Sequence, residues 1–281
     1  MWIRRPGVIL VLLLSLVVGY AVPASASDIM LTPTRVVFEG RDRSHVVHVA
    51  NTGTRPSTFR ISFFNQRMTR EGQFESITAP TSPTGEQFAE DMIRYSPRIV
   101  TIPPGGSQVV RLQLRKPADI QSGEYRSHLL FQAVDAQAGS SIETLDASGE
   151  TRLTARLIPI YGISIPVIVR HGQTSMRVAM DNVELLSPEG RQRELSLLLS
   201  REGNQSAFGD LEVTFRPRGA MEDLSLARRR GVSIYTPNTE RLIRIPLNTP
   251  QGVELSDGRL RVVYRDAAGR SRVLAENSID L

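Results

Sequence analysis

The histidines are the first residues whose chemistry could define a function, and one pair of them is closely spaced. His45 and His48 lie in the segment Ser44–Val49, where polar and apolar residues alternate as they do in a β-strand. Residues three apart on a strand face opposite sides of the sheet, so the two imidazoles cannot share a metal ion without a bulge. We therefore expect ordinary strand histidines, and we predict no metal site.

Motifs of other catalytic and nucleotide-binding sites are missing from the sequence. The chain contains no cysteine, which excludes a thiol nucleophile and a cysteine metal site. It contains no G-x-S-x-G nucleophile motif and neither of the phosphate-binding motifs G-x-G-x-x-G and G-x-x-x-x-G-K-[ST]. The sequence predicts no catalytic residue and no cofactor, so we expect a protein that is not an enzyme.

Arginine carries nearly all of the positive charge. The formal net charge of the full sequence is +5, and it falls to about +3 without residues 1–27, which include Arg4 and Arg5. A basic balance can indicate nucleic-acid binding, but the arginines here are spread along the chain and interleaved with acidic residues. The one dense cluster, Arg228–Arg230, is expected in a solvated loop. We predict no nucleic-acid partner.

Residues 1–27 have the order of a secretory signal peptide. Arg4 and Arg5 precede the apolar run Val8–Gly19, and Ala24-Ser25-Ala26 supplies the small residues of a cleavage site. The apolar run is too short for a membrane-spanning helix. We expect an exported, periplasmic chain that does not insert into the membrane after cleavage, with cores that hold without disulfides.

The remaining sequence is a succession of short strand-like runs separated by turns. Runs rich in Val, Ile, Phe and Thr alternate with Gly, Pro and Asn turns, first over residues 29–169 and again over 177–279. This pattern predicts an all-β protein of two immunoglobulin-like β-sandwich domains. We place the domains at 28–170 and 171–281, divided at the polar break His171–Thr174. Met68–Glu90 is expected to be a long loop or irregular edge, and Ala220–Arg229 has a weak helical pattern.

Three segments of the first predicted domain resemble, in the same order along the chain, landmark segments of a known family. Leu31–Gly40, Pro97–Gly105 and Gly123–Leu129 follow one another at the spacing of landmarks in the PapD-like periplasmic chaperones of pilus assembly. The resemblance covers about 140 residues, and the second domain matches only as a generic sandwich. It implies a chaperone that stabilises exported pilus or fimbrial subunits by donating a β-strand, and then delivers them to an outer-membrane usher.

The resemblance also assigns a role to Arg35. This residue matches the cleft arginine of the family, which grips the carboxylate at the end of the bound subunit, a task that suits the planar guanidinium. The family pairs that arginine with a lysine on the last strand of the first domain. Matching the family's proline to Pro166 puts Tyr161 near the lysine position. Either Arg156 substitutes for the lysine or the anchoring differs.

The segment before Tyr161 has the pattern expected of a donated strand. Leu153, Ala155 and Leu157 alternate with polar residues, so one face of an extended segment at 152–160 would be apolar. A shift of one residue would instead present Arg156, Ile158 and Ile160. These residues could also pack within their own sandwich.

Two other classes of protein remain open. One is a secreted β-sandwich that binds a ligand such as carbohydrate, although the sequence after the signal peptide has no tryptophan for such a site. The other is a structural subunit of a surface fibre, which would show a donor extension or an incomplete second domain; neither is evident in the sequence.

Overall fold

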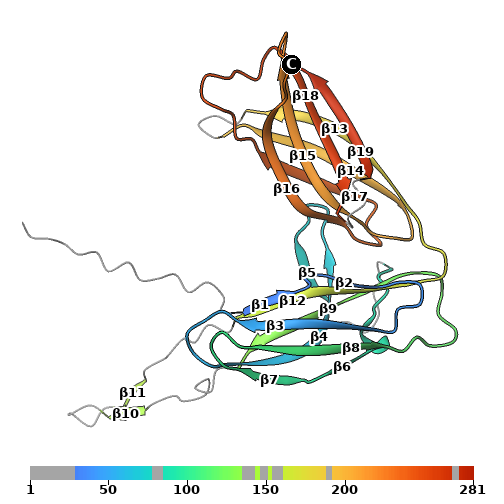
Figure 1. The fold of residues 1–281 in the computed structure, drawn as a ribbon, viewed down its shortest axis with the longest axis vertical. Coiled ribbons are helices and arrows are strands. Elements are labelled where there is room, and N and C mark those ends of the chain that lie inside the picture. Colours follow the sequence, from blue (N-terminus) through green and yellow to red (C-terminus); the bar gives the residue numbers. More distant parts are fainter. Residues whose placement is uncertain are drawn as a thin grey trace, which may run out of the picture.

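The chain folds into two β-sandwiches joined by one short segment (Figure 1). The computed structural model describes residues 29–77, 85–134, 143–145, 151–153, 161–187, 192–267 and 272–281. The expected signal peptide lies outside these residues. Within them, no helix has the length and apolar character needed to cross a membrane. The protein is all-β, with two immunoglobulin-like sandwiches, as the alternating sequence predicts.

The first sandwich encloses its core between two sheets. One sheet has the strand order β1–β3–β8–β6, and the other has the order β2–β12–β9–β4–β5, with β7 paired to β4. The strands of the first sheet are β1 (Ile29–Thr32), β3 (Ser44–Asn51), β8 (Ser107–Leu114) and β6 (Ile93–Ser96). Those of the second are β2 (Val36–Phe38), β12 (Gly162–His171), β9 (Gly123–Ala133), β4 (Ser57–Met68), β5 (Phe74–Ile77) and β7 (Ile99–Ile102).

Alternation explains how these strands pack. On β3, Val47 and Val49 are fully buried, whereas Val46 and His48 face outward. On β12, Ile165, Val167 and Val169 enter the same core. Residues of period two share one face of a strand, so the other face of β12 remains available for contacts outside the core.

Seven strands of the second sandwich lie within the described residues. β13 (Met176–Leu186), β14 (Glu194–Gly203) and β17 (Glu240–Pro246) form one sheet. The other sheet contains β16 (Leu224–Ile234), β15 (Ala207–Pro217), β18 (Gly258–Asp266) and β19 (Val273–Asp280). Tyr264 is fully buried between them, and its hydroxyl donates a hydrogen bond to the carbonyl of Val232.

The segment between the sandwiches is short. β12 ends at His171 and β13 begins at Met176. The division of the chain at residues 170 and 171 stays a prediction, and these are the strand ends nearest to it. A separate two-stranded pair is formed by β10 (Glu143–Leu145) and β11 (Thr151–Leu153), with Glu143 opposite Leu153.

Local expectations were met only in part. The irregular edge expected at residues 68–90 contains a short edge strand, β5, which forms a hairpin with β4, and a 3₁₀ turn follows at Glu90–Met92. The weak helical pattern at 220–229 leads into strand β16 instead. Arg228–Arg230 therefore lie on β16, with exposed side chains, and not in a loop. Local propensity is weak there, because pairing with β15 decides the conformation.

Candidate functional site

One face of the sheet β2–β12–β9–β4–β5 is turned toward the second sandwich, and strand register orders its side chains in rows. Ile168 lies opposite Arg126, and Pro166 lies opposite His128. His128 in turn lies opposite Phe64 on β4. Directly opposite residues share a face of the sheet. Arg126 and His128 are therefore neighbours in the middle of this face.

Arg35 stands between β1 and β2, where the two domains meet. Its Nη1 atom donates a hydrogen bond of 3.3 Å to the hydroxyl of Tyr235. Its guanidinium also lies 4.4 Å from the centre of the Phe208 ring, as a cation–π contact. Tyr235 and Phe208 both belong to the second sandwich. Nη2 of Arg35 is buried without a hydrogen-bond partner in the described part of the chain.

Arg126 approaches the same tyrosine from β9. Its guanidinium lies 4.1 Å from the centre of the Tyr235 ring, and its Nη2 donates to the carbonyl of Gln66. The side chain is buried, and burial is the main reason why its pKa is lowered. Two guanidinium groups thus share one aromatic ring at the domain junction, because the Arg35 guanidinium lies 5.4 Å from the same ring.

His128 is an uncharged neighbour of these arginines. Burial, followed by the charges of Arg126 and Arg35, lowers its pKa to about 3. Its ring packs at 5.6 Å, centre to centre, against both Phe64 and Phe74. The imidazole is therefore neutral at physiological pH.

A buried carboxylate fastens the two sandwiches next to this cluster. The Glu124 side chain is fully buried and accepts hydrogen bonds from the backbone N–H and the hydroxyl of Ser206, in the second sandwich. It also accepts a hydrogen bond of 3.2 Å from Nε of Arg170. These charge-assisted bonds satisfy Glu124 across the interface, so this carboxylate has a structural role.

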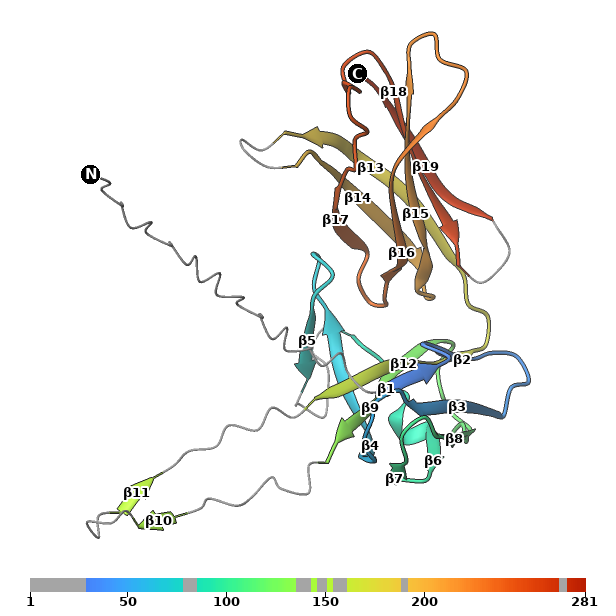
Figure 2. The same ribbon diagram turned by 60° about the vertical axis from the view of Figure 1, so that its left-hand side comes forward.

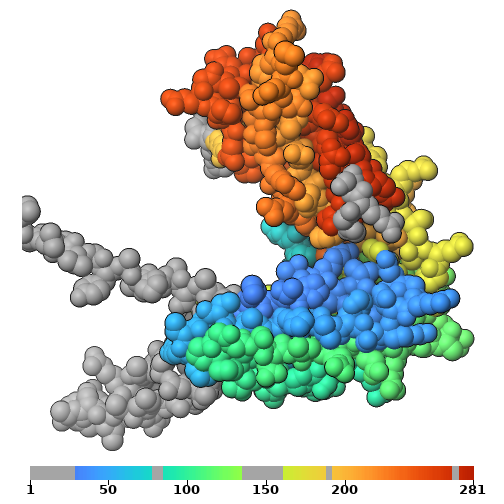
Figure 3. All heavy atoms as spheres, in the orientation of Figure 1, coloured from blue at the N-terminus to red at the C-terminus, as the bar shows by residue number. Residues whose placement is uncertain are grey.

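The β4–β5 hairpin forms a second attachment between the domains. The N–H of Leu242 donates to the carbonyl of Arg70, and the side-chain amide of Asn238 donates to the carbonyl of Met68. Arg70 also pairs with Glu240 at 3.2 Å. Figure 3 shows the two sandwiches in direct contact, with atoms of this hairpin between them. The interface between the two domains is therefore held by several separate sets of contacts.

One edge of the first sandwich is only partly covered. β12 pairs with β9 along its whole length, but on its other side it pairs with β2 only at Val167–Val169. The carbonyl of Tyr161 bonds to the N–H of Ala133 on β9. Since hydrogen bonding alternates along an antiparallel ladder, the backbone groups of Gly162, Ser164 and Pro166 point to the uncovered side. Within the described residues, no strand pairs with them there.

The residues predicted for subunit binding fall in different parts of the molecule. Arg35 lies at the domain junction. Leu153 is the last residue of β11, of which only the backbone is described. Ala155, Arg156, Leu157 and Ile158 lie outside the described residues, so the predicted apolar segment stays a prediction. Tyr161, the residue near the expected lysine position, is 61% exposed and lies at the far end of the open part of β12 from Val167.

Sequence reasoning missed Arg126, His128 and Tyr235. A usable signal was present in Glu124-Tyr125-Arg126-Ser127-His128, where charged or imidazole side chains recur at every second position just before the apolar run Leu129-Leu130-Phe131. That pattern indicates a polar stripe on one face of β9. The contribution of Tyr235 could not be found in this way, because it comes from another domain about 110 residues later in the chain.

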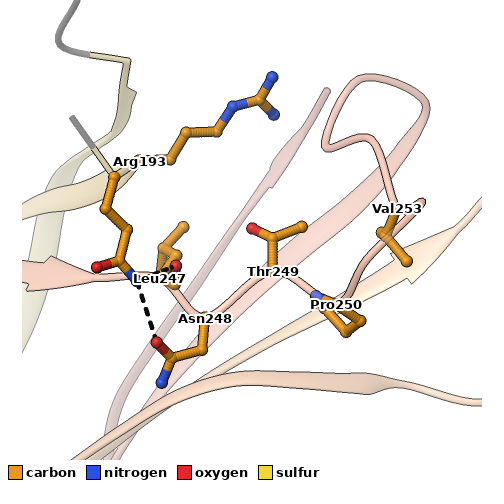
Figure 4. A pocket seen from close by; sticks show the side chains of 7 residues that line it. Arg193, Leu247, Asn248, Thr249, Pro250 and Val253 are labelled. Atoms are coloured by element: carbon orange, nitrogen blue, oxygen red, sulfur yellow. Dashed lines mark hydrogen bonds between the residues drawn. The ribbon is translucent and has the colours of Figure 1, made fainter. Parts of the chain in front are cut away.

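The described residues offer little for a catalytic or metal site elsewhere. They contain no cluster of three or more His, Cys, Asp or Glu side chains that could hold a metal ion. A surface pocket of about 540 Å³ lies where β14 begins and β17 ends (Figure 4). Gln192 donates hydrogen bonds there to Asn248 and to the carbonyl of Leu247. Arg193 is the one charged residue among those that line it.

Comparison with known proteins gives structural matches and no sequence matches. No protein-family model and no curated protein matches the chain. The chain is similar to the YadV chaperone, with 11% identity and a TM-score of 0.44 over 90% of this chain and 100% of that one. It is also similar to the Pseudomonas aeruginosa CupB2 chaperone, with 12% identity and a TM-score of 0.40 over 89% and 98% of the two chains. A third match, with 12% identity and a TM-score of 0.41 over 90% and 96%, is the Salmonella enterica SafA pilin in complex with the SafB chaperone.

Proposed function

We propose that this chain is a periplasmic chaperone that binds exported pilin-like subunits by strand addition, without a catalytic step, and passes them to an outer-membrane usher. The edge of β12 at Gly162–Pro166 is the surface that would pair with the subunit. Arg35 would hold the carboxylate at the end of the subunit chain.

The observation that carries this proposal is the position of Arg35 relative to the open edge. β2 runs parallel to β12, and its first residue, Val36, lies opposite Val167. A foreign strand on Gly162–Pro166 would occupy the same side of β12 as β2. If it runs parallel to β12, its C-terminal end arrives next to Arg35. The unpaired Nη2 of Arg35 is a suitable donor for a terminal carboxylate.

Side chains must supply most of the affinity. Gly162 and Ser164 each offer an N–H and a C=O, whereas Pro166 offers only its C=O. Each backbone hydrogen bond contributes about 0.5–1.5 kcal/mol net, and each buried leucine contributes about 1.5–3 kcal/mol. We propose that the strand continues toward residues 152–160, where Leu153, Ala155 and Leu157 or, in the alternative register, Arg156 and Ile158 would meet the subunit.

Substitution of Arg35 tests the proposal. The tagged chain is isolated from periplasm, and the exported proteins that accompany it are identified by mass spectrometry. Arg35→Ala is expected to lose these partners and to remain folded, because Arg35 is only partly buried and its contacts with Tyr235 and Phe208 are among several attachments between the domains. Arg111→Ala is the matched control, since Arg111 is exposed on β8 in the other sheet.

The outcomes separate the candidate functions. Loss of partners from the Arg35 variant alone supports the chaperone. Fibre-type partners recovered with the Arg35 variant at the native yield would refute the role of this arginine. A chain that recovers no fibre-type subunit, and instead polymerises with itself, would favour a fibre subunit.

A further inference from the structure

The two arginines at the domain junction have more hydrogen-bond donors than acceptors. In the described part of the chain, Nε and Nη1 of Arg126 and Nη2 of Arg35 are all buried without a partner. Nδ1 of His128, next to Arg126 on the same face, also has none. A buried donor without an acceptor costs about 1–3 kcal/mol, and more when the group is charged. A structure that retains several such donors in one place is suited to an anionic ligand.

The carboxylates closest to this cluster already have other partners. Glu124 raises the pKa of Arg126, so it lies near, but its oxygens are bonded to Ser206 and Arg170. Glu86 lies 3.8 Å from Arg67. Among the described residues, neither Arg35 nor Arg126 forms an ion pair. Within the residues that the structure describes, no bonded carboxylate therefore neutralises the positive charge of the cluster.

We propose that Arg126 is a second anchor for the carboxylate at the end of the bound subunit, together with Arg35. This inference rests on the proposed function and adds a residue to it. Both guanidinium groups are held against the Tyr235 ring, so their orientation is set before the ligand arrives. Arg126 supplies from β9 the second cation that the sequence lacks at Tyr161.

A ligand-binding role and a purely structural role of Arg126 predict opposite changes in the stability of the free protein when this residue is replaced. An arginine that serves only the fold contributes stability, and its loss lowers the unfolding midpoint. An arginine that keeps unsatisfied donors for a ligand lowers the stability of the free protein, as functional residues often do. Replacement of a buried charge by an apolar side chain of similar volume is often neutral or stabilising. Arg126→Met is the substitution that tells these roles apart.

Acetate is a suitable probe because it carries the same carboxylate group. Thermal unfolding of the free native chain is measured at pH 7 in sodium acetate and in sodium chloride of equal ionic strength. Binding to the folded state alone raises the midpoint, so we expect a higher midpoint in acetate. Arg126→Met should be at least as stable as the native chain in chloride, and it should lose the acetate effect. Arg126→Lys keeps the charge without the planar fork, and it should bind acetate about tenfold more weakly or worse. Arg111→Met is the control.

Each outcome of these experiments either supports or overturns the role of Arg126 as a carboxylate anchor. No acetate effect on the native chain overturns the inference and leaves the chaperone proposal to the Arg35→Ala experiment. An acetate effect that survives in Arg126→Met also overturns it. If Arg126→Met loses the acetate effect but still recovers subunits at the native yield, the anion site exists but does not serve the subunit, and the proposal fails. Loss of both the acetate effect and the subunits from the Arg126 variants, with Arg111→Met unchanged, supports it.

Discussion

Acidification should destabilise this protein through His128, and the size of the effect follows from the burial of this residue. The His128 side chain lies between Phe64 and Phe74, beside Arg126, and is 3% exposed. In the folded chain its pKa is about 3, against an ordinary value of 6.5. The unfolded chain therefore takes up a proton as the pH falls below 6.5, whereas the folded chain does not. The contribution of the neutral histidine is complete above pH 6.5 and is lost progressively as the pH falls toward 3.

One pH unit in this window is equivalent to about 1.4 kcal/mol. Between pH 7 and pH 5, His128 should remove about 2 kcal/mol from the free energy of unfolding. Urea unfolding followed by far-UV circular dichroism is the suitable assay, because the one tryptophan, Trp2, lies in the expected signal peptide. His128→Gln should lose this part of the pH dependence, and His48→Gln, at an exposed position of β3, controls for the substitution itself. The reasoning fails if the native chain and His128→Gln have the same pH dependence. It also fails if NMR shows that the His128 ring in the folded protein titrates near pH 6.5.

Two further predictions concern the attachments between the domains. Glu124→Gln keeps the shape of the side chain but removes the charge that pairs with Arg170 and replaces one oxygen acceptor by a donor, so we expect a loss of about 3–5 kcal/mol in the free energy of unfolding. Urea unfolding measures the loss, and an unchanged midpoint would contradict the structural role of this carboxylate. Gly72→Ala should loosen the β4–β5 hairpin, because Gly72 has a φ of +85° and an added Cβ would collide with the Arg241 side chain. Gly40→Ala is the matched control, with a φ of +58° and open space around the added methyl group. Hydrogen exchange at the N–H of Leu242 should increase in the first variant only, and equal exchange in both would show that the contact with Arg241 is unimportant.

The sequence predicted the fold well because sheet formation depends on a local pattern. In β3, the alternation that put His45 and His48 on opposite faces is confirmed, because His48 is exposed beside Val46 whereas the partly exposed His45 packs against the buried Phe38. The weak helical pattern at residues 220–229 shows the limit of local patterns, because residues 224–229 belong to strand β16. The apolar spacing of that segment is compatible with a helix. Its pairing with strand β15 makes it a strand, and that pairing cannot be read from the residues of the segment alone.

The candidate site was predictable only in part. Arg35 could be selected from the order of motifs around it. Its contacts with Phe208 and Tyr235 could not, because they depend on how the second sandwich is placed against the first. The polar residues Glu124, Arg126 and His128 were visible in sequence as a pattern, but the same pattern is typical of a solvated face. The second domain covers these residues, and in the described part of the chain Nε and Nη1 of Arg126 are then buried without hydrogen-bond partners.

The open edge and the arginine at its end have a common structural cause. The chain leaves the first sheet after β1, which pairs with β3, and enters the second sheet at β2, which pairs with β12 (Figure 2). Because β2 contains only three residues, it covers only three residues of β12. Arg35 is the last residue before β2, so it lies where the covered part of β12 gives way to the open part. A longer β2 would pair with more of β12 and close its edge. It would also move the point where the chain passes from one sheet to the other away from Tyr235. The length of this one strand therefore determines how much of the β12 backbone stays unpaired within the described residues and, under the proposed function, where the chain of a bound subunit would end.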